Sequence, residues 1–192
     1  MSVSVSVLIA NSGLLTVTAI IQNIQQASKG DMNIYIMRGL PGGGKTFFVH
    51  RLARELVKDG ESVGICSADF YHCGVPKQPV LPGDYDKLGP YVFKPENLAY
   101  AHPACMSGFL AAYQQKMQNI FVDNTNIHAW EISPYVLLGE TFGYTVEILE
   151  VQATYSSCLE RQTHGVPELT MYRMRESLAA EILPPWWTVK RV

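Results

Sequence analysis

The amino-acid sequence predicts an α/β fold of three layers, in which a central parallel sheet lies between two layers of helices. Short apolar runs that suit buried strands alternate along the chain with segments of helical periodicity, which is the pattern of parallel sheets. A glycine-rich turn at residues 39–46 joins the first of these runs to a helix. The chain of 192 residues is long enough for one such domain with a well-buried core.

The N-terminal segment differs in composition from the rest of the chain, because residues 1–28 contain no charged side chain. Residues 2–7 alternate serine with valine, which suits a strand, and residues 14–24 suit a helix. We therefore expect an uncharged extension, residues 1–31, before one α/β domain, residues 32–192. The extension lacks the basic residues of a signal peptide, and polar residues interrupt its apolar run. We expect it to pack on the domain or on a partner protein; membrane attachment and a remnant of a larger polypeptide are the alternatives.

The glycine-rich turn matches the P-loop pattern of a glycine, four residues and then Gly-Lys-Thr. Its members are Gly39, Leu40, Pro41, Gly42, Gly43, Gly44, Lys45 and Thr46. An apolar strand at residues 33–37 precedes it, and a helix at residues 47–58 follows, as a P-loop requires. The glycines have no Cβ, so backbone N–H groups are free to point at a phosphate. Lys45 is expected to neutralise the β- and γ-phosphates of ATP, and the Thr46 hydroxyl to ligate Mg²⁺.

Two further strands are expected to end at carboxylates. An apolar run at residues 62–67 is followed by Asp69, and another at residues 120–123 ends with Asp123. Between them, residues 70–94 are rich in glycine, proline and tyrosine, which favours a long loop that acts as a lid or binds substrate. Because the carboxyl ends of parallel strands meet at one edge, we expect the P-loop and both carboxylates to lie together.

The remaining elements continue the alternation of helices and strands. Helices are expected at residues 94–117, 133–138, 155–162 and 168–182, and a strand at residues 144–151. Ser133 is expected to cap the second of these helices, with Pro134 at its first position. Residues 184–187, two prolines and two tryptophans, are expected to end the fold.

The two carboxylates are candidates for catalysis and metal binding. Asp69 is a candidate general base for a hydroxyl group opposite the γ-phosphate; the alternative is that it caps a turn or helix after its strand. Asp123 has the position of a Walker B acid, which holds Mg²⁺ through water or binds substrate. Asn124 and Asn126 either contact substrate or only shape the turn.

Arg161, just before a turn with glycine and proline, is a candidate lid arginine over the phosphates. Arg173 and Arg175 are the alternatives, and each of the three also suits a solvated surface position. Taken singly, His102, His128 and His164 favour structural roles.

The net charge of −2 argues against a broad basic surface for non-specific binding along nucleic acid, although not against a local pocket for a strand end. The four cysteines form no CxxC pair, which favours reduced thiols in a cytosolic protein. We expect a cytoplasmic location, with the nucleus as the alternative.

Several of these segments together resemble one family. They are residues 38–46, 67–71, 101–102, 122–126, 130–131, 134–136 and 164–166. They resemble the P-loop kinase domain of NEDD4-binding protein 2-like proteins, which is similar in turn to phage-type polynucleotide 5′-hydroxyl kinases. The resemblance covers about residues 32–180. It implies a P-loop kinase fold with a lid segment, and ATP-dependent phosphorylation of a 5′-hydroxyl on DNA or RNA.

The resemblance also implies roles for individual residues. Asp69 matches the family's general base, Asp123 its strand-end acid near the substrate, and Arg161 a lid arginine. Lys45 and Thr46 match its phosphate and Mg²⁺ groups. Two positions depart from the pattern: Phe70 replaces the second of two paired acids, and His72 stands where phage-type kinases hold the acceptor phosphate with an arginine. A neutral histidine holds phosphate more weakly.

The leading hypothesis is therefore a polynucleotide 5′-hydroxyl kinase with Asp69 as base, in which His72, Asp123 and Asn126 contact the acceptor. A P-loop kinase for small molecules is the second hypothesis, favoured by the absence of a basic face. The third is an ATP-binding interaction module without transferase activity, in which the extension or residues 186–187 bind a protein partner.

Overall fold

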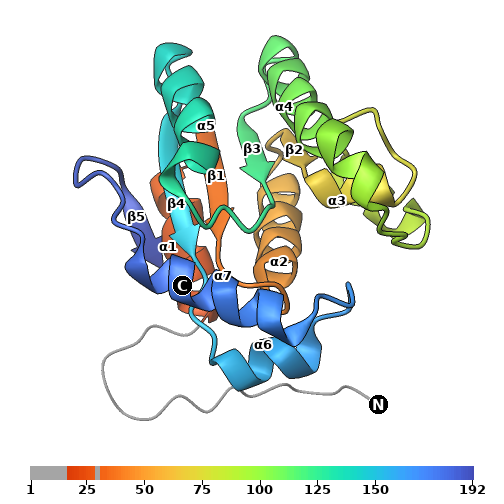
Figure 1. Cartoon of the computed structure of the whole chain (residues 1–192). Helices are drawn as coiled ribbons and strands as arrows, with labels where there is room; N and C mark the ends of the chain where they lie inside the picture. The colour runs from red at the N-terminus through yellow and green to blue at the C-terminus, as the bar shows by residue number, and fades with distance from the viewer. Residues whose placement is uncertain (1–16, 29–30) are drawn as a thin grey trace, which may run out of the picture.

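The computed structural model describes residues 17–28 and 31–192 and has three layers, with a five-stranded sheet between helices (Figure 1). The strands are β1 (Asn33–Arg38), β2 (Val63–Cys66), β3 (Asn119–Val122), β4 (Thr145–Glu150) and β5 (Val189–Arg191). They lie in the order β2-β3-β1-β4-β5, and all four pairings are parallel. The predicted three-layer α/β fold is confirmed.

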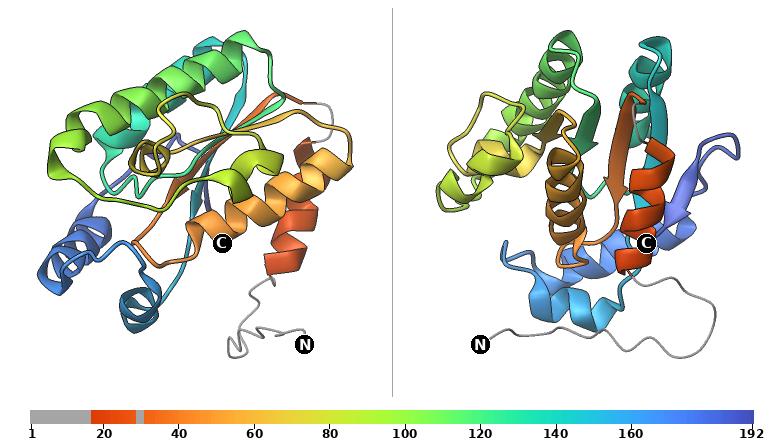
Figure 2. Two further views of the ribbon diagram at one scale, coloured as in Figure 1. Left: turned by 90° about the vertical axis from the view of Figure 1, so that its right-hand side faces the viewer. Right: turned by 180° about the vertical axis from the view of Figure 1, so that it is seen from behind.

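Helices cover both faces of the sheet (Figure 2). Helices α1 (Val17–Ser28) and α2 (Lys45–Lys58) lie on one face, and α4 (Leu98–Gln114) and α5 (Ala129–Thr141) lie on the other. Successive side chains of β1 serve the two cores in turn: Tyr35 packs with α2, while Ile34 packs with α4 and α5. A strand buried on both faces is expected to be apolar throughout, as the central part of β1 is.

Helix α1 belongs to the segment that we expect to be an extension, and it packs on the domain. Ile21 and Ile24 are buried with the core residues of α2, and Arg51 Nη2 donates a hydrogen bond to Thr18 Oγ1 at 2.7 Å. The strand expected at residues 2–7 lies outside the described residues. Over the described ranges, no helix is both long enough and apolar enough to cross a membrane. The boundary after residue 31 stays a proposal.

The long loop expected at residues 70–94 is partly helical, so that prediction is wrong for its first residues. Helix α3 (Ala68–His72) begins directly after β2, because the Ser67 side chain accepts a hydrogen bond from the backbone N–H of Asp69 at 3.2 Å. Two 3-10 turns follow, η1 (Pro82–Lys87) and η2 (Pro95–Asn97), and the second leads into α4.

Helix α5 begins earlier than predicted. The backbone N–H of Ala129 donates to Glu181 Oε1 at 2.7 Å, and that of His128 donates to Glu131 Oε2 at 2.8 Å. These two carboxylates satisfy the start of the helix at Ala129, so the expected start at Ser133 is wrong and Pro134 lies inside the helix.

Residues 184–187 do not end the fold, as the sequence suggested, because the chain returns to the sheet as β5. The backbone N–H of Ile148 donates to Thr188 O at 2.9 Å, and Lys190 pairs with Glu147 on β4. Helices α6 (Tyr155–Arg161) and α7 (Glu168–Ala180), both predicted, lie across the carboxyl edge of the sheet (Figure 1).

The carboxylate of Glu181 provides a test of how α5 is held. Replacing Glu181 by alanine is expected to lower the free energy of unfolding by about 1 kcal/mol, as for a lost helix cap. The hydrogen bond from Ala129, and then that from His128, lower the pKa of Glu181 below its ordinary 4.5. This contribution is therefore present at neutral pH and is lost as the pH falls through the lowered pKa. Urea unfolding at pH 7 and pH 3 measures both effects. The control is Glu176→Ala, which removes an exposed carboxylate that accepts hydrogen bonds from Arg175.

Candidate active site

The turn after β1 has an open backbone cradle. Gly42 and Gly44 have φ angles of +72° and +99°, in the left-handed region that favours glycine. A Cβ built at Gly44 would meet no atom of the described residues within 4 Å, so within this part of the chain that side of the turn is open to a ligand. The start of α2 adds the positive end of a helix dipole, which suits a phosphate group.

The opposite side of the turn rests on helix α6. A Cβ at Gly42 would lie 2.2 Å from the carbonyl oxygen of Cys158 and 2.7 Å from the backbone nitrogen of Gln162. Cys158 and Leu40 also share a buried apolar cluster with Met171 of α7. The α6–α7 segment, which carries the predicted lid arginine Arg161, is therefore packed directly against the P-loop.

Lys45 and Thr46 occupy the first turn of α2. Lys45 is buried, and its Nζ donates a hydrogen bond to Leu40 O at 2.9 Å. Burial lowers the pKa of Lys45, while the nearby carboxylates of Asp123 and Asp69 act in the opposite direction. Thr46 Oγ1 donates to Asp123 Oδ2 at 2.7 Å.

Asp123, directly after β3, is buried, and its second oxygen, Oδ1, has no hydrogen-bond partner among the described residues. Burial raises its pKa from 3.8 to about 6, although Lys45 and the Thr46 hydroxyl both lower it. An unpartnered buried carboxylate oxygen beside a threonine hydroxyl fits a hard divalent cation, since Mg²⁺ prefers oxygen ligands. These residues therefore fit the Mg²⁺ that the sequence suggests.

Asp69 lies in the first turn of α3, with 45% of its side chain exposed. Its charge acts on both Lys45 and Asp123, so three groups that lie far apart in the sequence come together at one edge. His164 Nδ1 of the turn between α6 and α7 lies 3.7 Å from Asp69 Oδ2.

A second loop, which carries Tyr91, contacts the same turn between α6 and α7. The ring of His164 stacks on that of Tyr91, with centroids 3.9 Å apart and planes at 9°. Burial, and then the charge of Asp69, raise the pKa of Tyr91 to about 12. Tyr91 is not among the residues that the sequence predicts for the site, because it lies in a segment without periodicity and contacts a turn that is distant along the chain.

Other candidate residues are buried in the loops around the site. His72 is buried, with its ring between those of Tyr91 and Phe93 at centroid distances of 5.4 and 5.2 Å. Asn126 is buried too, and its Nδ2 donates to Met37 O at 2.7 Å. Both side chains are therefore held within the loops around the site, and their expected contact with substrate stays a prediction. Asn124 likewise accepts a hydrogen bond from the backbone N–H of Ala68 at 2.8 Å.

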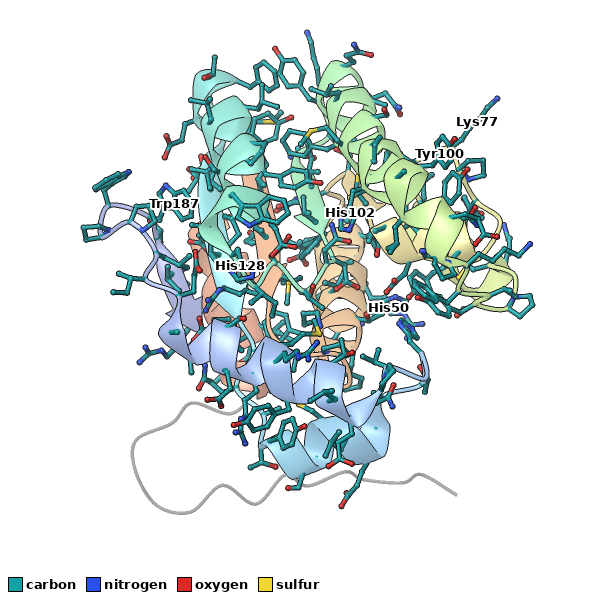
Figure 3. The ribbon with its side chains drawn as sticks, viewed as in Figure 1. His50, Lys77, Tyr100, His102, His128 and Trp187 are labelled. Atoms are coloured by element: carbon teal, nitrogen blue, oxygen red, sulfur yellow. The ribbon has the colours of Figure 1, made fainter. Side chains whose placement is uncertain are left out.

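Arg161, at the end of α6, is exposed, and its Nε donates to Ser157 O at 3.1 Å. Its charge acts on Cys158, which lies against Gly43 of the P-loop. Its role as a lid arginine over the phosphates stays a prediction. Figure 3 shows that Tyr100 of α4 and Lys77 lie away from the α6–α7 segment.

The contact between Gly42 and α6 predicts a steric effect. Gly42→Ala is expected to weaken ATP binding by at least about tenfold, because the new methyl group overlaps Cys158 and must displace α6 or the P-loop. Gly74→Ala is the matched control, since Gly74 has a φ of +79° but no atom within 4 Å of a built Cβ. Both variants should lose about 1–2 kcal/mol through backbone strain. Calorimetric titration with ATP measures the affinity, and urea unfolding measures the loss of stability. Equal ATP affinities of the two variants would show that α6 moves aside without cost to ATP binding.

A family model described as "AAA domain" matches residues 34–164. NEDD4-binding protein 2 of Homo sapiens is 33% identical over 147 residues, which cover 74% of this chain. The chain spans 7% of the length of that human protein.

Two solved structures share the fold. A chain of the Pnkp1/Rnl/Hen1 RNA repair complex has a TM-score of 0.53 at 13% identity, and the match covers 78% of this chain and 44% of that one. The Mycobacterium tuberculosis APS kinase CysC in complex with AMPPNP and APS has a TM-score of 0.53 at 16% identity, over 84% of this chain and 88% of that one.

Proposed function

The chain belongs to the family described as AAA domain, a family of P-loop proteins, and from this premise we propose that it is an ATP-dependent phosphotransferase. Its fold is that of P-loop NTPases and kinases. The acceptor that we propose is the 5′-hydroxyl end of RNA or DNA, which receives the γ-phosphate of ATP with Asp69 as general base.

One arrangement carries this proposal: the parallel neighbours β2 and β3 end beside each other, where Ser67 Oγ donates to Asp123 O at 2.7 Å, so Asp69 and Asp123 lie at the same edge as the P-loop. A half-exposed carboxylate beside a phosphate cradle suits proton acceptance from an attacking hydroxyl. The backbone amides of the P-loop orient the phosphates, and Lys45 neutralises charge that develops during transfer. Thr46 and Asp123 would hold Mg²⁺, which when bound neutralises phosphate charge.

The polynucleotide acceptor draws support from the relatives. One structural neighbour is part of an RNA repair complex. Residues 122–126 and 164–166 resemble segments of the kinase domain of NEDD4-binding protein 2-like proteins, and the similarity of that group to phage-type polynucleotide kinases supports the same acceptor class. A nucleic-acid end bound locally also agrees with the net charge of −2, since it needs no extended basic surface.

A kinase for small molecules is the second candidate. It is favoured by His72, which lies buried among rings where phage-type kinases carry an arginine for the acceptor phosphate. The similarity to the fold of an APS kinase agrees with it. An ATP-binding module without transferase activity is the third candidate.

Transfer from γ-labelled ATP tests the three candidates. We expect label on 5′-hydroxyl RNA and DNA oligonucleotides and none on oligonucleotides that already carry a 5′-phosphate. Label on nucleosides or small alcohols alone would support the second candidate, and ATP binding without transfer to any acceptor would support the third. Lys45→Met, purified in the same way, controls for contaminating kinases.

We also propose a cytoplasmic location, with the nucleus as the alternative, and a protein partner for the N-terminal extension. Co-purification with the chain lacking residues 1–16, which keeps α1, against the full chain, tests the partner.

A further inference from the structure

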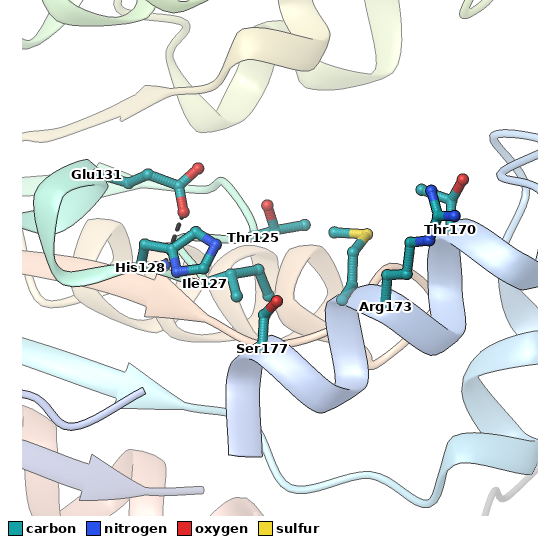
Figure 4. A pocket seen from close by; sticks show the side chains of 8 residues that line it. Thr125, Ile127, His128, Glu131, Thr170, Arg173 and Ser177 are labelled. Atoms are coloured by element: carbon teal, nitrogen blue, oxygen red, sulfur yellow. Dashed lines mark hydrogen bonds between the residues drawn. The ribbon is translucent and has the colours of Figure 1, made fainter. Parts of the chain in front are cut away.

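A cavity with both polar and apolar lining lies beside the candidate active site, between the loop after β3 and helix α7 (Figure 4). Its volume is about 250 Å³, which is less than a drug-sized ligand needs and suits a single sugar-phosphate unit. The residues that line it are Thr125, Ile127, His128, Glu131, Thr170, Arg173, Met174 and Ser177.

Both walls of this cavity are tied to the P-loop. On one wall, the carbonyl oxygen of Thr125 accepts a hydrogen bond from Gly39 N at 2.9 Å, and Thr125 follows Asp123 by two residues. On the other wall, Met174 packs against the apolar cluster that contains Leu40. A molecule in the cavity therefore borders the same edge of the sheet as the two carboxylates of the site.

The two ends of the cavity differ in charge, and Figure 4 shows Arg173 and Glu131 far apart within it. The guanidinium of Arg173 has no hydrogen bond or ion pair with any residue that the structure describes. At the other end, Glu131 accepts from the backbone of His128, and His128 Nδ1 lies 2.9 Å from Glu181 Oε2. These carboxylates would repel an anion, so an anionic ligand belongs at the Arg173 end, where the hydroxyl of Thr170 adds a donor.

We propose that this cavity binds the phosphodiester group that follows the terminal nucleoside of the acceptor strand, with Arg173 as the main ligand. The inference rests on the proposed function and names the subsite that the acceptor uses. A planar guanidinium with five N–H donors matches two phosphate oxygens at once. It would supply a bidentate phosphate contact, which a neutral histidine such as His72 cannot make.

Steady-state kinetics of Arg173→Gln test the proposal, with ATP saturating and two acceptors: a 5′-hydroxyl RNA trinucleotide and the matching nucleoside, which has no phosphate. KM for the trinucleotide is expected to rise about 10- to 100-fold, which is the range for a lost charge-assisted hydrogen bond. KM for the nucleoside and KM for ATP should not change. Arg173→Lys should restore part of the affinity.

Arg175→Gln is the matched control, because Arg175 lies two residues further along α7, pairs with Glu176 and covers the rings of Tyr155 and Tyr172. Equal trinucleotide KM values for the two variants would overturn the inference, as would a rise in KM for ATP or for the nucleoside. Fluorescence anisotropy of a 3′-labelled RNA trinucleotide without ATP separates binding from transfer. Binding that Arg173→Gln weakens, in a protein without transfer activity, would support the subsite and reject the proposed function; no binding by the wild type would overturn the inference.

Discussion

Asp69→Asn is expected to lower kcat for phosphoryl transfer by about 10²- to 10⁴-fold, the usual contribution of a general base. The amide cannot take the proton of the attacking hydroxyl, although it has nearly the same size as the carboxylate. The Ser67 cap of α3 accepts from the backbone N–H at position 69, not from its side chain, so the helix start should survive. The affinity for ATP should therefore stay within about twofold, as for a change outside the phosphate cradle.

Rates with a 5′-hydroxyl oligonucleotide, together with calorimetric titration of ATP, measure this prediction. Asp84→Asn is the control, because the half-exposed carboxylate of Asp84 in η1 pairs, among the described residues, with Lys87 alone. Unfolding free energies of both variants should lie within about 0.5 kcal/mol of the wild type. If Asp69→Asn turned over as fast as Asp84→Asn, the base would have to be another group, and Asp69 would only complete the start of α3.

The parts of the fold that the sequence predicts are those with a local cause. Strands β1 to β3 contain apolar runs, β4 largely alternates apolar and polar residues, and the P-loop between β1 and α2 has a fixed glycine spacing. The parts that it misses depend on distant partners. Helix α5 begins at Ala129 because Glu181, 52 residues later, accepts its N–H. Strand β5 has three residues and only one apolar side chain, so its pairing with β4 decides its conformation.

The candidate site divides in the same way. Parallel strands bring their carboxyl ends to one edge, which is why the sequence alone is enough to group Asp69 and Asp123 with the P-loop. Contacts between loops have no such rule. The stacking of Tyr91 on His164, the burial of His72 and the cavity beside Arg173 arise where aperiodic segments meet. No pattern in the sequence predicts those contacts.

Asp123→Asn is expected to have two opposite effects, a more stable protein and an inactive one. The native pKa of Asp123, about 6, lies above its ordinary 3.8. The carboxyl group of Asp123 therefore binds its proton more tightly in the folded chain than in the unfolded chain. Stability is therefore lost as the pH rises from about 4 to about 6, by up to about 3 kcal/mol. This pKa already includes the attraction of Lys45, which lowers it; burial raises it by more.

An asparagine resembles the protonated carboxyl group and carries no charge at any pH. Without Mg²⁺ and nucleotide, the variant should thus be about 2–3 kcal/mol more stable than the wild type at pH 8 and equal to it near pH 4. Urea unfolding in EDTA at both values measures the difference, and Asp84→Asn should show none. A variant that is less stable than the wild type at pH 8 would mean that the attraction between Lys45 and the Asp123 carboxylate outweighs the cost of burying that carboxylate.

The same substitution should lower kcat/KM by at least about 100-fold, because a neutral amide oxygen is a poor ligand for a hard cation. Mg²⁺ with ATP should raise the melting temperature of the wild type, since a ligand that binds only the native state stabilises it. The variant should gain much less from Mg²⁺ but keep its response to ATP alone. Equal responses to Mg²⁺ would show that Asp123 does not hold the metal. In that outcome the buried, unpartnered oxygen of Asp123 would instead point to a contact with the acceptor.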